Sequence, residues 1–176
     1  MITTCSLEGF PNRCVHYCIV KGDHSDIDYE NVNNDRSLHF VAVNPVMVFG
    51  LNHLLVACMK AINREETGKK FISGDINREI MYSLSPSKNL KEIMKMFCPS
   101  AGSPFVLLVS LESEDAISSF IKTKGLEVEK DDAILSQDKP EAVKQQMIHH
   151  FGITEEELSF YSLADLVQMG VGMKNV

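Results

Sequence analysis

The stretch from Phe105 to Leu111 places the strongest constraint on the fold, because six of its seven residues are apolar. A Gly-Ser-Pro turn comes directly before it. A strand with one face in water alternates apolar and polar residues, whereas a strand covered on both faces is apolar almost throughout. We therefore expect a central strand at residues 105–111, covered on both sides by other parts of the chain.

Three other segments predict strands with weaker patterns. Residues 13–20 are rich in β-branched and aromatic side chains and end at a Lys-Gly pair, which is typical of a strand. Residues 38–43 form a second candidate, closed by an Asn-Pro pair. Residues 126–129 favour a short edge strand. The polar, acidic segment 23–37 is left open between a surface helix and a loop.

Helical periodicity is clearest in residues 51–62, where apolar side chains recur every three or four positions. The stripe that we expect to be buried consists of Leu51, Leu54, Leu55, Cys58, Met59 and Ile62. His53, Lys60 and Arg64 fall on the opposite side, which we expect to face solvent.

Three shorter helices are predicted around the central strand. Asp75 suits the N-cap of a helix that carries Ile76, Ile80 and Leu84 on one face. Residues 87–97 have apolar side chains on one side and a separate stripe of lysines on the other. A third helix, opened by acidic residues after the central strand, runs to about Lys122.

The C-terminal third also reads as helical. Pro140 suits the first turn of a helix that Gly152 stops. Capping-box spellings begin at Thr154 and at Ser162, and the second opens a final helix that we expect to end at Gly170. Two interpretations of this last helix stay open: its apolar side packs on the protein's own core, or it forms an edge at which a partner docks.

These elements together predict an α+β fold, with a small, mostly antiparallel sheet packed with about six helices. The 176 residues, 44% of them hydrophobic, suffice for the core of one domain spanning 1–176, and no linker or repeat divides them. No apolar run approaches the roughly 20 residues that a bilayer span requires, and the first residues lack the features of a signal peptide. We expect a soluble, intracellular protein.

Five cysteines are an odd number, scattered through a chain too long to need disulfide staples, so we interpret them as reduced thiols that are mostly buried. Cys14, His16 and Cys18 alternate along one predicted strand and would project from one face, which raises the possibility of a metal site. A closed zinc site takes about four ligands, however, and no second Cys/His pair with suitable spacing exists. Core thiols are the simpler interpretation, and we expect neither metal nor cofactor.

No constellation of catalytic residues is found. The Gly68-Lys69-Lys70 run lacks the upstream glycine and the Ser/Thr of a phosphate-binding loop. Ser85 and Lys88 spell a Ser-x-x-Lys motif without the companion motifs of that hydrolase family, so a helix junction is the better interpretation. His149 and His150 point about 100° apart on a helix and cannot jointly face one metal, so we expect them to be solvated or half-buried.

Residues 44–98 form a basic segment, with eight Lys/Arg against five Asp/Glu in a chain whose net charge is −7. A cationic segment in an acidic chain suggests an anion-facing surface, and phosphate-bearing partners head the list of candidates. The candidate RNA-binding residues are His53, Lys60, Arg64, Lys69, Lys70, Lys88, Lys91 and Lys95. Because no aromatic stacking platform lies among them, a strong platform for single-stranded RNA is not indicated.

The same segment resembles the TPRKB family, the PRPK-binding subunits of the KEOPS (EKC) complex. The matching motifs are Asn44-Pro45, His53-Leu-Leu-Val-Ala57 with Lys60-Ala61, Gly68-Lys69, Glu79-Ile80, Leu84-Ser-Pro86 and the helix from Lys91 to Phe97. The closing Leu163-Ala-Asp165 and Lys174-Asn-Val176 are similar to the C-terminal helix and tail of that family.

The resemblance implies a non-catalytic subunit that binds the small atypical kinase/ATPase PRPK and works with the other KEOPS subunits. It also implies help in bringing tRNA to the complex, which installs threonylcarbamoyladenosine at tRNA position 37. The expected state is a monomer within a hetero-complex, in the cytoplasm and nucleus. The candidate kinase-binding residues are Leu163, Leu166, Val167, Met169 and Val171.

Two alternatives remain open from the sequence. One is a protein-only adaptor, in which the basic segment meets an acidic protein surface and no RNA is bound. The other is an enzyme or metal protein that uses the Cys14–Cys18 segment or the histidine pair.

Overall fold

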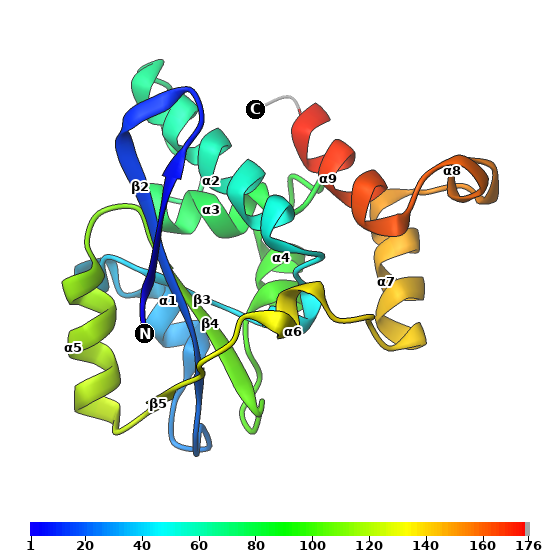
Figure 1. Ribbon diagram of the computed structural model, residues 1–176. Coiled ribbons are helices and arrows are strands. Elements are labelled where there is room, and N and C mark those ends of the chain that lie inside the picture. Colours follow the sequence, from blue (N-terminus) through cyan, green and yellow to red (C-terminus); the bar gives the residue numbers. More distant parts are fainter. Residues whose placement is uncertain (175–176) are drawn as a thin grey trace.

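The computed structural model describes residues 1–174, and its centre is an antiparallel sheet (Figure 1). The strand order is β1-β2-β4-β3, and β5 pairs with the end of β2 that β1 leaves open. The strands are β1 Thr3–Leu7, β2 Phe10–Lys21, β3 Val41–Val43, β4 Phe105–Ser110 and β5 Glu127–Val128. The predicted α+β class with an antiparallel sheet is therefore confirmed.

The part of the chain that the structure describes contains nine α-helices and two 3-10 helices, more than the six helices expected. The α-helices are α1 Tyr29–Asn34, α2 Leu51–Glu66, α3 Ile76–Ser83, α4 Leu90–Phe97, α5 Glu114–Lys124, α6 Ala133–Ser136, α7 Glu141–Phe151, α8 Glu155–Phe160 and α9 Leu163–Met173. The 3-10 helices are η1 Arg36–Leu38 and η2 Pro45–Met47. None of the described helices has both the length and the apolarity to cross a membrane.

Strand β4 is central and covered on both faces, as its sequence predicts. Leu107 and Val109 belong to the cluster formed with α2, α3, α4, α6, α7 and α9. Val106 and Leu108 belong to the cluster formed with α1 and α5 on the opposite face. All four side chains are fully buried, and each such burial contributes roughly 1.5–3 kcal/mol to folding. The same strand therefore holds two layers of helices together.

The N-terminal strands differ from the prediction in their extent. Strand β1 was not expected, because its side chains are mostly exposed or half-buried and its structure comes from backbone pairing with β2. The expected strand at 13–20 begins earlier, at Phe10, and the one at 38–43 is reduced to Val41–Val43 because Leu38 lies in η1. The open segment 23–37 contains both a loop and α1.

The outer edge of β3 is covered by a side chain of α1. The Asn33 amide donates to the carbonyl of Ala42 at 2.8 Å and accepts from its N–H at 2.7 Å, as a neighbouring strand would. An open edge is a template for pairing with another chain. Asn33 therefore ends the sheet at β3.

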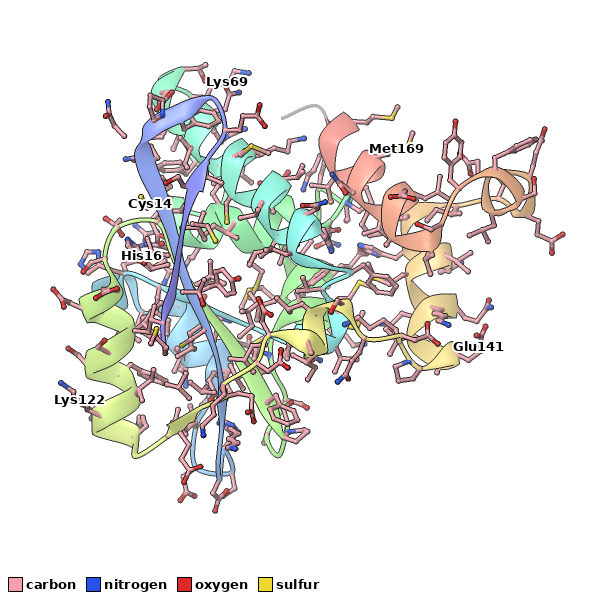
Figure 2. The ribbon with its side chains drawn as sticks, in the orientation of Figure 1. Cys14, His16, Lys69, Lys122, Glu141 and Met169 are labelled. Carbon is pink, nitrogen blue, oxygen red and sulfur yellow. The ribbon has the colours of Figure 1, made fainter. Side chains whose placement is uncertain are left out.

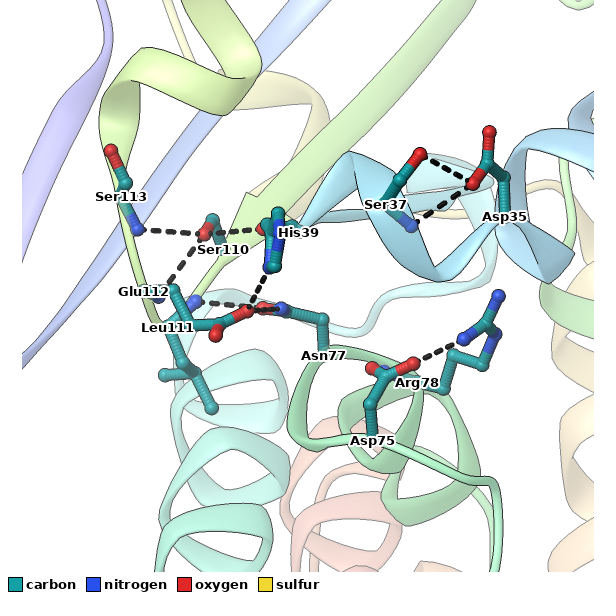
Figure 3. Close-up of polar contacts among 10 residues, drawn as sticks. All are labelled: Asp35, Ser37, His39, Asp75, Asn77, Arg78, Ser110, Leu111, Glu112 and Ser113. Carbon is teal, nitrogen blue, oxygen red and sulfur yellow. Dashed lines mark hydrogen bonds and ion pairs between the residues drawn. The ribbon is translucent and has the colours of Figure 1, made fainter.

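A group of polar contacts joins the end of β4 to η1 and α3 (Figure 3). The Glu112 carboxylate accepts from Asn77 Nδ2 at 2.5 Å and from His39 Nδ1 at 3.1 Å. Asn77 Oδ1 accepts from the N–H of Leu111 at 2.9 Å, and Ser110 Oγ donates to the carbonyl of His39 at 2.8 Å. The bonds to the N–H of Leu111 and the carbonyl of His39 satisfy backbone groups near the end of the strand.

Helix α2 is rotated relative to the predicted buried stripe. His53, Ala57 and Ala61 are fully buried together with Leu54, Cys58 and Ile62. The predicted members Leu51, Leu55 and Met59 are only half-buried. The small alanines allow a close approach of neighbouring helices.

Helix α9 continues past Gly170 to Met173, so the expected end at Gly170 is wrong. A Cβ at Gly170 would lie 2.7 Å from Cδ1 of Phe151 in α7, whereas a Cβ at Gly172 would meet nothing within 4 Å. Gly170 is therefore needed for the close contact between α7 and α9. Asn175 and Val176, part of the family resemblance, lie outside the described residues.

We expect Gly170→Ala to lower the free energy of unfolding by about 1–3 kcal/mol, because overpacking against Phe151 outweighs the better helix propensity of alanine. Gly172→Ala is the matched control on the same helix. It should raise stability by about 0.5–1 kcal/mol, since it gains propensity without a clash. Urea unfolding measures both, and equal effects of the two substitutions would contradict the proposed packing.

Candidate functional site

The predicted RNA-binding residues fall into separate groups in the structure. Lys60, Arg64 and Lys69 line a pocket of about 410 Å³ between α2, the end of α9 and the start of β2. Lys174 joins them, and no acidic residue belongs to the lining. Figure 2 shows Lys69 beyond the end of α2, beside the turn between β1 and β2. We call this feature the cationic pocket.

Lys60 holds the end of α9 in place. Its ammonium donates to the carbonyl oxygens of Val171 at 2.7 Å and Lys174 at 2.6 Å, with Gly172 at 3.2 Å. The last carbonyls of a helix lack partners within it, and a lysine there both satisfies them and opposes the helix dipole. Burial lowers the pKa of this ammonium.

Arg64 is also partly used within the protein. Its Nε donates to the carbonyl of Lys70 at 2.8 Å and lies 3.4 Å from Oε1 of the fully buried Glu79. Glu79 Oε2 in turn accepts from the Ser73 hydroxyl at 2.6 Å and from two backbone N–H groups. Among the described residues, the buried Nη1 of Arg64 has no hydrogen-bond partner. The guanidinium is therefore held mainly by contacts within the protein.

Lys174 is the member that the sequence did not predict. Its ammonium donates to the carbonyl of Tyr82 at 2.6 Å and lies 3.3 Å from the centroid of that ring. Burial lowers its pKa to about 7, and the nearby carboxylate of Glu79 opposes this effect. Lys174 belongs to the tail motif of the family resemblance, but no periodicity in the sequence indicates that its side chain returns to α3.

The predicted lysine stripe at Lys88, Lys91 and Lys95 divides between two places, and only Lys91 and Lys95 lie in α4. Lys88 is exposed and does not line the cationic pocket, although its charge helps to lower the pKa of Lys174. Lys91 and Lys95 instead line a groove between α1 and α4. Lys70 is exposed and contributes its carbonyl to Arg64. The predicted lysine stripe is therefore not one continuous surface.

The expected exposure of His53 is wrong. Its ring is fully buried, with edge contacts to Phe97 and Phe151. Nδ1 accepts from the N–H of Phe49 at 3.1 Å, so Nε2 carries the proton and donates to the carbonyl of Leu84 at 2.9 Å. Burial lowers its pKa to about 4. His53 is a neutral link between α2 and α3 and does not reach a surface where RNA could bind.

The His53 environment predicts a pH-dependent stability. Because the folded-state pKa of about 4 lies below the unfolded value of about 6.5, the unfolded chain takes up the proton first as pH falls. About 3 kcal/mol should be lost between pH 6.5 and 4, and the loss should level off below pH 4.

The His53→Gln variant is the control, since its amide keeps a donor and cannot titrate. Urea unfolding at several pH values should show a smaller slope between pH 6.5 and 4 for this variant than for the wild type. Equal slopes would contradict the buried, neutral imidazole.

The apolar residues proposed for the last helix mostly face inward. Leu166, Val167 and Val171 are buried, and Leu163 packs against the core. This corrects the expectation that these four side chains face a partner, because they attach α9 to its own protein. Met169 is 47% exposed, and Figure 2 shows it on the outer side of α9.

The large exposed apolar side chains are nevertheless concentrated at this end. Phe160 is 75%, Tyr161 53%, Met169 47% and Met173 75% exposed, against only Met1 and Ile72 elsewhere in residues 1–174. We call these four residues the α8–α9 apolar surface. A reciprocal capping box at Thr154 starts α8, and the Ser162 hydroxyl caps α9, so both predicted helix starts are confirmed. Four of the six large exposed apolar side chains in the described residues therefore belong to the segment 160–173.

The residues that resemble catalytic or metal-binding motifs in the sequence form no such site in the described part of the chain. Ser85 is fully buried and bonds His150 Nε2 at 2.6 Å, at the junction between α3 and α4. His149 is exposed and His150 half-buried, as expected. His16 contacts Thr4 at 2.9 Å, and the described residues contain no group of three His, Cys, Asp or Glu side chains that could hold a metal ion. The five cysteines are free thiols, but only Cys18 and Cys58 are buried.

A comparison with protein-family models gives one match that covers most of the chain. The family described as kinase binding protein CGI-121 matches residues 21–175. The match includes every helix described above and leaves β1 and most of β2 outside. It confirms the family resemblance seen in the sequence. The chain therefore belongs to the CGI-121 (TPRKB) family of kinase-binding proteins.

Proposed function

We propose that this protein is the non-catalytic, kinase-binding subunit of a KEOPS (EKC) complex. In this role it holds the PRPK kinase/ATPase and helps to recruit tRNA for threonylcarbamoyladenosine modification, in the cytoplasm and the nucleus. Membership of a kinase-binding family carries the kinase half of the proposal. The catalytic step belongs to another subunit.

The α8–α9 apolar surface is the best-supported place for the kinase. It is rich in aromatic and methionine side chains, which are enriched at protein interfaces. Met169 and Met173 are four residues apart and lie on one side of α9, opposite the buried Val167 and Val171. A stable complex buries roughly 800 Å² on each partner, so residues around these four must also take part.

Substitutions in this surface should weaken kinase binding without unfolding the protein. We expect Met169→Lys to weaken binding of a PRPK-type kinase at least tenfold, because it places a charge within an apolar interface. Ile72→Lys is the matched control, since Ile72 is also 47% exposed but lies outside the surface. Titration calorimetry on the purified pair measures both variants. Equal weakening, or none for Met169→Lys, would place the kinase elsewhere.

The cationic pocket supports the RNA half of the proposal. Four basic side chains line it together, and no carboxylate belongs to the lining. Clustered lysine and arginine side chains bind phosphates and release counterions. Lys88 is exposed just before α4, and its charge acts on Lys174 of the pocket.

Two double charge-reversal variants should distinguish the contribution of this pocket to tRNA binding from that of the rest of the basic segment. We expect Lys69→Glu with Lys88→Glu to weaken tRNA binding. The slope of the logarithm of the binding constant against the logarithm of salt concentration should become shallower by about 0.7 for each single-strand phosphate contact that is lost. Lys91→Glu with Lys95→Glu changes the net charge equally but lies in the other groove. Filter binding at several salt concentrations should leave this second variant close to wild type. Equal salt slopes for both variants would refute the pocket as the RNA site.

A protein-only adaptor remains the second candidate, and one observation favours it. Lys60 and Lys174 already donate to helix carbonyls, and Arg64 lies beside Glu79, so much of the positive charge serves the protein itself. Nuclease treatment of the assembled complex discriminates, because only an RNA-dependent association should be lost.

A further inference from the structure

A groove of about 1040 Å³ lies between α1 and α4 and contains none of the residues of α8 or α9. Its apolar lining includes Ile27 and Tyr29 on one side and Leu90, Met94 and Cys98 on the other. Tyr29 is buried and the three residues of the α4 side are half-buried. This volume is at the upper end of the range for small-molecule pockets, and the groove is open to solvent.

The two rims of the groove carry opposite charges. Asp26, Asp28 and Glu30 stand on the α1 side, and Lys91 and Lys95 stand on the α4 side, all of them exposed. Asp28 caps α1 through Asn31. Within residues 1–174, the side chains of Asp26, Glu30, Lys91 and Lys95 form no ion pair with one another or with any other residue. Each rim therefore presents charge that is available to a ligand.

The carboxylates of the α1 rim act on the floor of the groove. Burial is the main reason why the pKa of Cys98 is raised to about 11, and Glu30 and Asp28 raise it further. Both carboxylates therefore lie close enough to the floor to interact with a bound group. The acidic rim repels phosphates, which argues against nucleic acid in this groove.

Strand addition is also disfavoured at this position. Asn33 already occupies the N–H and the carbonyl of Ala42 on the edge of β3. A helix satisfies its own backbone and needs only an apolar face and compatible flanks to dock. Helices α1 and α4 have six and eight residues, which corresponds to about 9 and 12 Å and suits two to three turns of a docked helix.

We propose that the α1–α4 groove binds an amphipathic helix of a protein partner, with its apolar side on Leu90 and Met94 and with oppositely charged flanks. The basic flank faces the carboxylates of α1, and the acidic flank faces Lys91 and Lys95. This surface is independent of the kinase-binding proposal, because it shares no residue with the α8–α9 apolar surface.

Four designed helical peptides with one common apolar face test the proposal. Their two flanks carry Lys and Glu, Lys and Lys, Glu and Glu, or Gln and Gln. Fluorescence anisotropy with the full chain should show the Lys/Glu peptide binding about fivefold more tightly than the other three, as expected for a few partly exposed ion pairs. Exchanging the two flanks is uninformative, since a helix can lie in the groove in either direction.

Variants of the rim residues should change the order of the peptide affinities. Lys91→Glu with Lys95→Glu makes both rims acidic and should make the Lys/Lys peptide the tightest binder. Asp26→Lys with Glu30→Lys leaves Asp28 in place but makes the α1 rim net positive, and should favour the Glu/Glu peptide. Lys122→Glu with Lys130→Glu, outside the groove, has the same change in charge as the first variant and should keep the wild-type order.

A substitution that fills the groove tests whether the peptides bind there. Ala101 is exposed and lines the groove, so Ala101→Trp should fill it and weaken every peptide at least tenfold. The proposal would be overturned if all four peptides bound equally, or if the rim variants left the order of affinities unchanged. It would also be overturned if a single-stranded oligonucleotide bound to the wild type and lost binding in the Ala101→Trp variant. The rim residues are all exposed, so their variants remain informative even where Ala101→Trp does not fold.

Discussion

Two lysine side chains hold the C-terminal helix on the body of the protein, each by hydrogen bonds from its ammonium group to backbone carbonyls. Lys60 of α2 donates to the last carbonyls of α9, and Lys174, directly after α9, donates to the carbonyl of Tyr82 in α3. Carbonyl groups at helix ends must find partners in water or in other side chains. Here the partners come from the neighbouring helices, so the outward direction of Met169 and Met173 depends on these contacts.

The same contacts explain why a basic sequence segment is a poor guide to a basic surface. Lys60 is partly buried at a helix end, and Arg64 lies beside the fully buried carboxylate of Glu79. Lys91 and Lys95 lie across a groove from Asp26, Asp28 and Glu30, at and before the start of α1. Net charge along the chain counts ammonium and guanidinium groups, but it does not tell which of them the fold already uses. The cationic pocket brings several of them together without a lining carboxylate.

The features that the sequence predicted correctly depend on local physics. The apolar run at β4, the N-cap at Asp75 and the capping box at Thr154 each result from neighbouring residues, and each appears in the structure. The misplaced features depend on contacts between distant segments. His53 looked like an exposed polar residue because nothing in its own helix indicates that Phe49 and Leu84 satisfy both ring nitrogens. Strand β1 likewise exists through pairing with β2 and has little apolar signal of its own.

The docking of α9 also links the two proposed binding surfaces. A kinase bound to the α8–α9 apolar surface favours the docked position of α9, because a ligand stabilises the state to which it binds. The docked position places the carbonyl groups that orient Lys60, and it places Lys174 at the cationic pocket. An anion in that pocket interacts with the same two lysines. Because coupling between two sites is reciprocal, kinase binding and anion binding should each strengthen the other through this one helix.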